Sequence, residues 1–455
     1  MSYRENGTKE KQIRMIAELQ KQIMNVSRLA PGGQAGFPWP VGVREPSSPK
    51  TRFDVIRYDY FTETHVYLGT DHSNIAELRG ADKEDVDDII RVAKEKLLQK
   101  YGKKYVFGRL VNGYRRFDAT RGMEYLLDVA LRERDGDYEL HRRVRLVRPL
   151  SHVEIVPMPY VTENTRVAVV LAARRSDRPR LAAFLRHYER TALAAGDNSV
   201  LMAVFVYEHA GDATAGDDDA FAEVKALVAA MERKYKDGAK IAWMNVRARE
   251  PSEFHLLDVV SKKFQPEALL LRTTADIELN PELLNRCRMN AILRWQVFFP
   301  MGFYEYKPSV VYGTDVAPPE TLDINRVHGH FDRDAYEHAC FYNGDYAETR
   351  KIIADAIPIV TDVKKVPDGV ARAAAATPTP DLYELFLRSR LHVFRAVEPA
   401  LRSRYRAVVC DAHAQEEAAY RRCLARRGEA LGSRSQLAKL ILDAQADEKG
   451  QEDQV

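Results

Sequence analysis

The sequence has no long hydrophobic run, little net charge and none of the common phosphate-binding or protease motifs. No stretch approaches the roughly 18 consecutive apolar residues of a membrane-spanning helix. The polar N-terminus lacks the apolar segment of a secretory signal peptide. With 69 basic and 66 acidic residues, the net charge of +3 argues against a dedicated nucleic-acid-binding protein. We find no glycine-rich phosphate loop, no nucleophile elbow and no serine or cysteine protease arrangement.

Cysteine is scarce, and its spacing argues against a zinc site. The chain has 4 cysteines, none of them in a C-x-x-C pair: Cys287, Cys340, Cys410 and Cys423. Four cysteines allow three disulfide pairings, and the sequence does not choose between them. We take Cys287–Cys340 and Cys410–Cys423 as a working pairing, with free buried thiols as the alternative.

The 455 residues, of which 45% are hydrophobic, are enough for two or three folded domains. From residue 161 onward, apolar strands alternate with amphipathic helices, which predicts an α/β domain with a mixed, mostly parallel sheet covered on both faces. Ligands of such sheets sit at the carboxyl ends of the strands. The predicted organisation is a helix and Pro/Gly-rich linker over 1–52, a small α+β region over 53–160, the α/β domain over 161–447 and a disordered tail over 448–455.

Periodicity also predicts individual elements of the α/β domain. The strands are expected at 166–173, 199–208, 240–246 and 268–271, and the helices at 177–194, 218–236 and 253–264. Another helix is expected over 381–397, because Leu382, Leu385, Phe386 and Leu391 have helical spacing.

An acidic loop follows the last of these strands. Asp276 and Glu278 are one residue apart, and Asn280-Pro281 then has the pattern of a helix start. Two carboxylates at this spacing can share a Mg²⁺ or Mn²⁺ ion that bridges a diphosphate. Because the pattern is common by chance, the residue types alone favour an ordinary solvated loop.

Asp381 and Glu384 are candidate catalytic acids. One of them could act as the general base that removes a proton from an acceptor hydroxyl. However, Asp381 also has the position of a helix N-cap, with Glu384 three residues later as in a capping box. Capping explains both residues, and we prefer that interpretation.

Arginines cluster in the first third of the chain. Arg115, Arg116 and Arg148 are candidate contacts for an acidic polysaccharide. An ordinary solvated surface explains them equally well.

Several long stretches resemble a known family. They are LVNGYRRFDATRGMEYLLD, RPLSHVEIVPMPYVTE, LLNRCRMNAILRWQVFFPMGF, ACFYNGDY, LHVFRAVEPALRSRYR and LGSRSQLAKL. Together they resemble the chondroitin synthase and chondroitin N-acetylgalactosaminyltransferase family, most closely its polymerizing-factor subunits. The resemblance extends from about Trp39 to Leu442.

The resemblance implies a Golgi type II membrane protein with two glycosyltransferase modules of the GT-A fold. This chain then holds the end of the first module and all of the second, without the membrane anchor. In active relatives the second module is a β1,4-N-acetylgalactosaminyltransferase, a hexosyltransferase that uses UDP-GalNAc and Mn²⁺. An oxidising lumen agrees with the cysteines.

The family's site motifs are altered in this chain. The Asp-x-Asp metal motif of active relatives falls on Thr274–Asp276, so the first carboxylate is missing. Their acidic base stretch falls on Asp381–Glu384, where Leu382 replaces an acid. A histidine that supplies another metal ligand falls near Ser403–Arg406, which contains none. These changes imply a second module that binds Mn²⁺ and UDP-sugar poorly or not at all.

We therefore expect a subunit that stabilises a catalytic chondroitin synthase subunit while GlcUA and GalNAc are added to a chondroitin chain. The rival interpretation is a weak hexosyltransferase in which Asp276 and Glu278 form a shifted metal site and Glu384 is the base. A third is a lectin-like binder without a protein partner.

Overall fold

The computed structural model describes residues 49–51, 54–68, 74–150, 159, 161, 164–208, 219–235, 241–313, 316–369, 380–410 and 417–452. The helix expected within 1–52 and nearly all of the linker after it lie outside the described residues. The chain forms two compact units, Met1–Val156 and Pro157–Val455.

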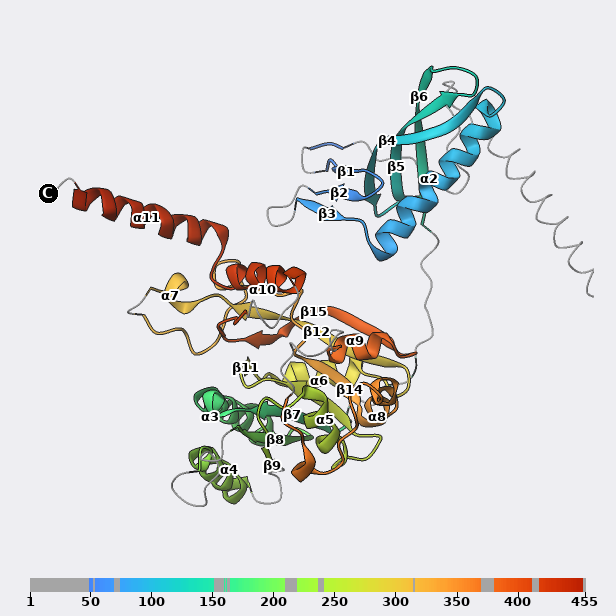
Figure 1. Cartoon of the computed structure of the whole chain (residues 1–455). Helices are drawn as coiled ribbons and strands as arrows, with labels where there is room; N and C mark the ends of the chain where they lie inside the picture. Colours follow the sequence, from blue (N-terminus) through green and yellow to red (C-terminus); the bar gives the residue numbers. More distant parts are fainter. Residues whose placement is uncertain are drawn as a thin grey trace, which may run out of the picture. The chain divides into compact units, whose positions relative to one another are not determined.

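The first unit is one antiparallel sheet with a long helix on it (Figure 1). The sheet has the order β3-β2-β1-β4-β5-β6. Its elements are β1 (Asp59–Phe61), β2 (His65–Tyr67), β3 (Ile75–Glu77), α2 (Gly80–Tyr101), β4 (Tyr105–Asp118), β5 (Gly122–Glu133) and β6 (Glu139–Pro149).

Alternation along β5 explains how this unit buries one face of its sheet. Tyr125, Leu127 and Val129 are fully buried in a cluster that includes the Val86 and Ile89 side chains of α2. The intervening residues Glu124 and Asp128 face the other side, where arginines bind them. The period-2 pattern therefore places apolar residues under the helix and charged residues on the opposite face.

The second unit is an α/β domain built on a nine-stranded sheet with the order β11-β15-β12-β14-β10-β7-β8-β9, and β13 beside β12. Its strands are β7 (Val167–Ala173), β8 (Ser199–Tyr207), β9 (Ile241–Arg247), β10 (Leu269–Thr273), β11 (Ile277–Glu278), β12 (Gln296–Glu305), β13 (Gly329–Phe331), β14 (Ala339–Tyr342) and β15 (His392–Ser403). Its helices are α3 (Arg178–Tyr188), α4 (Ala222–Tyr235), α5 (Glu253–Ser261), α6 (Pro281–Asn290), α7 (Pro308–Val311), α8 (Asn343–Arg350), α9 (Leu382–Leu387), α10 (Glu417–Glu429) and α11 (Arg434–Glu452).

The predicted fold class is confirmed by the strand directions and by the burial of both faces. Strands β10, β7, β8 and β9 are parallel neighbours, while β14 joins β10 to β12 by antiparallel pairing. Along β7, Val167 and Val169 pack with α3, α4 and α6, whereas Ala168 and Val170 pack with α5, α8 and α9. A strand that is buried on both faces has to be apolar at every position, which is why 166–173 is a continuous hydrophobic run.

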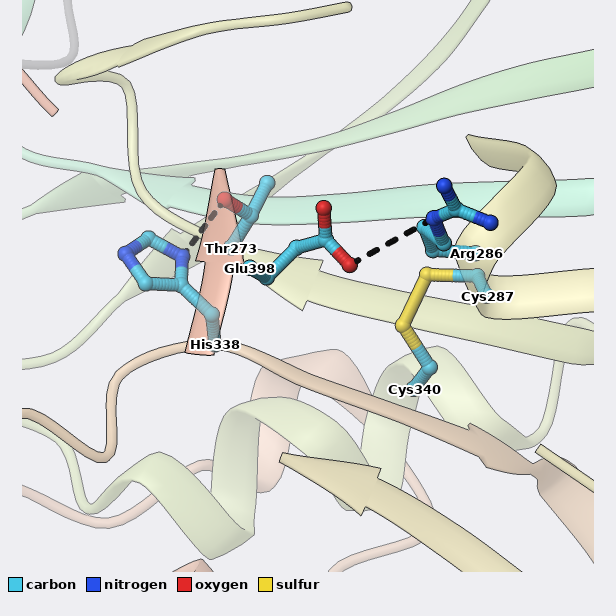
Figure 2. Close-up of a disulfide and its surroundings, with 6 residues drawn as sticks. All are labelled: Thr273, Arg286, Cys287, His338, Cys340 and Glu398. Atoms are coloured by element: carbon cyan, nitrogen blue, oxygen red, sulfur yellow. Dashed lines mark hydrogen bonds and ion pairs between the residues drawn. A yellow bond between two sulfur atoms is a disulfide. The ribbon is translucent and has the colours of Figure 1, made fainter. Parts of the chain in front are cut away.

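The four cysteines are joined as Cys287–Cys340 and Cys410–Cys423. The first disulfide links α6 to the central strand β14, and both of its cysteines are fully buried (Figure 2). The second links the chain after β15 to α10. Both agree with the working pairing.

The helix expected over 381–397 is wrong beyond Leu387. α9 ends there, and the Ser389 hydroxyl accepts a hydrogen bond from the Leu391 amide in the turn that follows. The chain then enters β15, whose residues from His392 onward pair in parallel with β12. The β-branched and aromatic residues Val393, Phe394 and Val397 suit a strand, and pairing with β12 outweighs the local helical spacing.

The C-terminal part is helical. α11 runs to Glu452 and thus includes residues 448–452 of the stretch that we predicted to be disordered. Within the described residues, no helix combines the length and the apolar character needed to cross a membrane.

We expect the Cys287–Cys340 disulfide to contribute more stability than Cys410–Cys423, because it closes a loop with a sequence separation of 53 rather than 13. Loop-closure entropy gives about 4 kcal/mol for the longer loop and about 3 kcal/mol for the shorter. Thermal unfolding of the C287A/C340A and C410A/C423A variants measures the difference. An equal or smaller loss for C287A/C340A would contradict it.

Candidate functional site

The acidic loop lies at the carboxyl end of β10, at the centre of the sheet. Thr274, Ala275 and Asp276 follow β10, β11 is the two-residue strand Ile277–Glu278, and α6 begins at Pro281. The Asn280 side chain accepts a hydrogen bond from the Glu282 amide at 2.9 Å, so it caps α6 as its sequence position predicts. The loop is therefore fixed by a parallel strand before it and a capped helix after it.

Asp276 is buried and bound by arginines from two other segments. Its Oδ1 lies 3.1 Å from Nε of Arg180 on α3, and its Oδ2 lies 3.4 Å from Nη1 of Arg406, which follows β15. Its carbonyl oxygen accepts a hydrogen bond from the Arg404 amide at 2.8 Å. Only 7% of Asp276 is exposed, so these contacts replace most of its hydration.

Glu278 is held in the same manner by a third arginine. Its Oε1 lies 2.5 Å from Arg404 Nη2, and both of its carboxylate oxygens accept from the Leu322 amide, at 3.1 and 3.2 Å. The Arg404 guanidinium also lies 3.2 Å from the carboxylate of Glu305, the last residue of β12. One arginine therefore joins β11 to β12 and satisfies two buried carboxylates.

These contacts do not fit a divalent metal. A metal ion needs free carboxylate oxygens, whereas the oxygens of Asp276 and Glu278 already face guanidinium or amide groups. Thr274 offers a neutral hydroxyl where the family motif has a carboxylate. Nowhere in the described parts of the chain do three or more His, Cys, Asp or Glu residues come together as a metal site.

Burial sets the electrostatics of the loop. It raises the pKa of Asp276, and the charges of Arg406 and Arg180 oppose this effect only in part. The ion pairs therefore offset the cost of desolvating a carboxylate rather than adding a large surplus of stability, as is usual for buried pairs.

Asp381 and Glu384 lie at the start of α9. The Asp381 side chain accepts a hydrogen bond from the Glu384 amide at 2.7 Å, so Asp381 is the helix cap. Glu384 is exposed. None of the contacts that hold Asp276 and Glu278 involves either residue, and the structure does not join the two predicted halves of the site.

The family model described as chondroitin N-acetylgalactosaminyltransferase matches residues 3–437. The chain belongs to this family. It is 44% identical over 434 residues to chondroitin sulfate synthase 2 of Mus musculus, and 40% identical over 447 residues to chondroitin sulfate glucuronyltransferase of Homo sapiens. These alignments cover 94% of this chain but only 54% and 56% of the two relatives, so the chain spans about half of their length.

Solved glycosyltransferases show only a distant likeness. A mannosyltransferase from Pyrobaculum calidifontis in complex with GDP-Man and Mn²⁺ is 12% identical, with a TM-score of 0.30 over 62% of this chain and 66% of that one. The galactosyltransferase LgtC is 8% identical, with a TM-score of 0.25 over 57% and 95% of the two chains. The GT-A-like arrangement therefore rests on the family and on the observed sheet.

The site of this chondroitin N-acetylgalactosaminyltransferase family member includes three arginines whose pairing with the acidic loop was not predicted: Arg180, Arg404 and Arg406. Arg404 and Arg406 lie in Ser403–Arg406, the stretch on which the family's histidine ligand falls. A signal for two of them was present. Arginine alternates at positions 402, 404 and 406, a spacing that places these side chains on one side of an extended segment. Arg180 had no comparable signal, because its partner lies almost a hundred residues away.

The arginines predicted to contact polysaccharide are paired within the first unit. Arg115 binds Asp82 at 2.9 Å, Arg116 binds Glu124 at 2.8 Å, and Arg148 lies 3.0 Å from Asp85. Only 11% and 17% of the Arg115 and Arg116 side chains are exposed, against 45% for Arg148. Polysaccharide contact stays a prediction, with Arg148 the most accessible of the three.

A fully buried histidine lies beside the end of β10. Nδ1 of His338 is 2.9 Å from Oγ1 of Thr273, as Figure 2 shows. Burial lowers the pKa of His338 to about 4. The neutral ring therefore packs beside Thr273, the last residue of β10 before the acidic loop.

His338 makes the stability of the second unit fall in mild acid. Its folded-state pKa lies below the ordinary value of 6.5, so its contribution is present above pH 6.5 and is lost as the pH falls toward 4. We expect a loss of about 2 kcal/mol between pH 7 and pH 5 from this residue alone. Unfolding of wild type and His338→Gln over that range measures it, and parallel curves for the two proteins would contradict it.

Proposed function

We propose that this chain is a subunit of a chondroitin-polymerising complex, in which it supports the alternating addition of GlcUA and GalNAc by a catalytic synthase subunit. Its second module acts as a scaffold with little or no transferase activity. The observation that carries this proposal is the pairing of both carboxylates of the acidic loop with Arg180, Arg404 and Arg406.

The relatives support the biosynthetic context. Chondroitin sulfate synthase 2 of Mus musculus and of Homo sapiens are 44% and 43% identical to this chain. Since the chain covers 54% and 55% of them, its substrates and partners remain part of the proposal. The Golgi lumen is the proposed location, because the Cys287–Cys340 and Cys410–Cys423 disulfides persist in oxidising compartments.

The chemistry of sugar transfer explains why such a site has little activity. A metal ion on the diphosphate stabilises the leaving group by several kcal/mol, and the loop has no free carboxylate pair to hold one. A general base increases the rate by about 10²–10⁴. The carboxylate of Asp381, the first candidate base, already accepts a hydrogen bond as the cap of α9. A domain can keep its fold after its catalytic groups are lost, since fold does not determine function.

The alternative is a weak UDP-GalNAc:glucuronosyl β1,4-N-acetylgalactosaminyltransferase. One observation favours it: 39% of the Arg180 side chain and 49% of the Arg406 side chain are exposed, so both could turn toward solvent. Asp276 would then be available to a metal, and Glu278 would join it once Arg404 also released its carboxylate. Exposed Glu384 could serve as the base.

A thermal-shift titration with UDP-GalNAc, with and without Mn²⁺, separates the two functions. A bound ligand at about 100 Kd stabilises a protein by about 2.7 kcal/mol. We expect no Mn²⁺-dependent shift, and we expect Asp276→Asn to leave chondroitin synthesis by a co-expressed catalytic subunit unchanged. A Mn²⁺-dependent shift that Asp276→Asn abolishes would support the weak enzyme instead.

Restoring the first carboxylate of the metal motif tests whether the arginines block the site. We expect Thr274→Asp alone to create no Mn²⁺-dependent stabilisation, because Arg180 and Arg406 still bind Asp276. The triple variant Thr274→Asp, Arg180→Ala, Arg406→Ala should gain it. Equal Mn²⁺ responses of the single and triple variants would show that the arginines are not what excludes the metal.

A further inference from the structure

One stretch of the long strand β15 has a neighbour on one side only. β12 pairs with β15 in regular parallel register from Gln296↔His392 to Met301↔Val397. On the opposite side, β11 pairs only with Arg402 and Ser403 at the far end of β15. Within the described residues no strand lies beside His392–Val397 on that side, so this stretch presents an open row of backbone donors and acceptors.

Natural sheets protect such edges with bulges, prolines or inward-pointing charges. The second half of β15 has these features: a register shift opposite Met301/Phe303, the buried carboxylate of Glu398 and Pro399. The first half has none of them. Its one charged residue is Arg395, whose guanidinium lies 4.2 Å from the Tyr336 ring and donates a hydrogen bond to the Arg333 carbonyl. The charge of Arg395 is thus bound by other side chains and backbone groups of this chain. The open stretch and the unprotected stretch therefore coincide.

Large apolar side chains are exposed on both faces of this edge. On one face lie Phe394, which is 39% exposed and stacks on Phe298, and Trp295, which is 42% exposed and contacts His392. Val397 is 50% exposed and, three positions after Phe394, belongs to the opposite face. Exposed apolar groups that flank an open backbone edge are the features by which a sheet accepts an added strand.

The backbone row and the nearby charges indicate what covers this edge. Only an extended polypeptide offers alternating N–H and C=O groups at the spacing of a sheet, whereas an oligosaccharide could contact Trp295 but would leave the backbone row open. Arg388 and Arg390 are exposed just before β15, and neither forms an ion pair within the described part of the chain. Carboxylates on the added segment would complement them.

We propose that His392–Val397 is the docking edge for an extended segment of the catalytic subunit, which adds to the sheet beside β15. Alternate apolar side chains of the segment pack against Trp295 and Phe394 on one face and Val397 on the other. Acidic residues at one end of it meet Arg388 and Arg390. This assignment rests on the proposed function, because it names the surface through which the scaffold holds its partner.

Co-purification of this chain with a co-expressed catalytic synthase subunit tests the edge. Val397→Lys places a charge on the docking edge, and we expect it to lower the co-purified subunit by about tenfold or more. Ile352→Lys is the matched control, because Ile352 is equally exposed at 51% but lies outside the sheet. Trp295→Ala should also weaken the complex, while Trp243→Ala, 38% exposed on the edge strand β9, should not.

Hydrogen exchange gives an independent measurement that does not depend on any variant. The His392 N–H donates to the Trp295 carbonyl, so the amides of Val393, Arg395 and Val397 are the ones that face the open side. We expect these three amides to exchange rapidly in the isolated chain and to become protected in the complex, with those of β9 unchanged. Protection in the isolated chain would show that another segment of this chain covers the edge, and protection by chondroitin oligosaccharides alone would assign it to glycan. Either result, or a complex that Val397→Lys leaves intact, overturns the proposal. No complex even with the wild-type chain would instead overturn the proposed function.

Discussion

The second unit depends on a single constraint: two carboxylates at the end of its central strand are buried and must be compensated. Asp276 and Glu278 are each 7% exposed, and unpaired charges at that depth would cost several kcal/mol each. Guanidinium groups supply the compensation in place of a metal ion. Because these groups come from α3 and from the chain after β15, the helix, the loop and the last strand are held by the same contacts.

The same contacts explain why β15 reaches the outer part of the sheet. Arg404 pairs with both Glu278 and Glu305, so the end of β15 is fixed between β11 and β12. The Cys410–Cys423 disulfide then ties the following chain to α10. With its far end fixed in this manner, β15 pairs with β12 at both ends of the strand and leaves His392–Val397 as an open edge.

Local pattern predicted the parts of the fold that local forces decide. The continuous apolar runs gave β7, β8 and β10, and Asn280 and Asp381 were recognised as helix caps from two or three neighbouring residues. The helix over 381–397 failed because β12, about a hundred residues earlier, decides the conformation of His392 onward. Arg180 was missed for the same reason, because long-range contacts leave little trace in residue spacing. Arg406 belongs to the stretch Ser403–Arg406 that the resemblance placed at the site, but its pairing with Asp276 was not predicted. For the loop itself, the altered Thr274–Asp276 motif led us to expect an impaired metal site, which stays a prediction.

Pairing the loop carboxylates with guanidinium groups rather than with a metal ion changes how the loop depends on its surroundings. A manganese ion exchanges with its surroundings, so a site that needs one loses its integrity when the compartment is depleted of manganese. The Arg180 and Arg406 side chains are part of the chain and cannot dissociate from it. The ion pairs that hold this loop therefore do not depend on the manganese supply and are not removed by chelators.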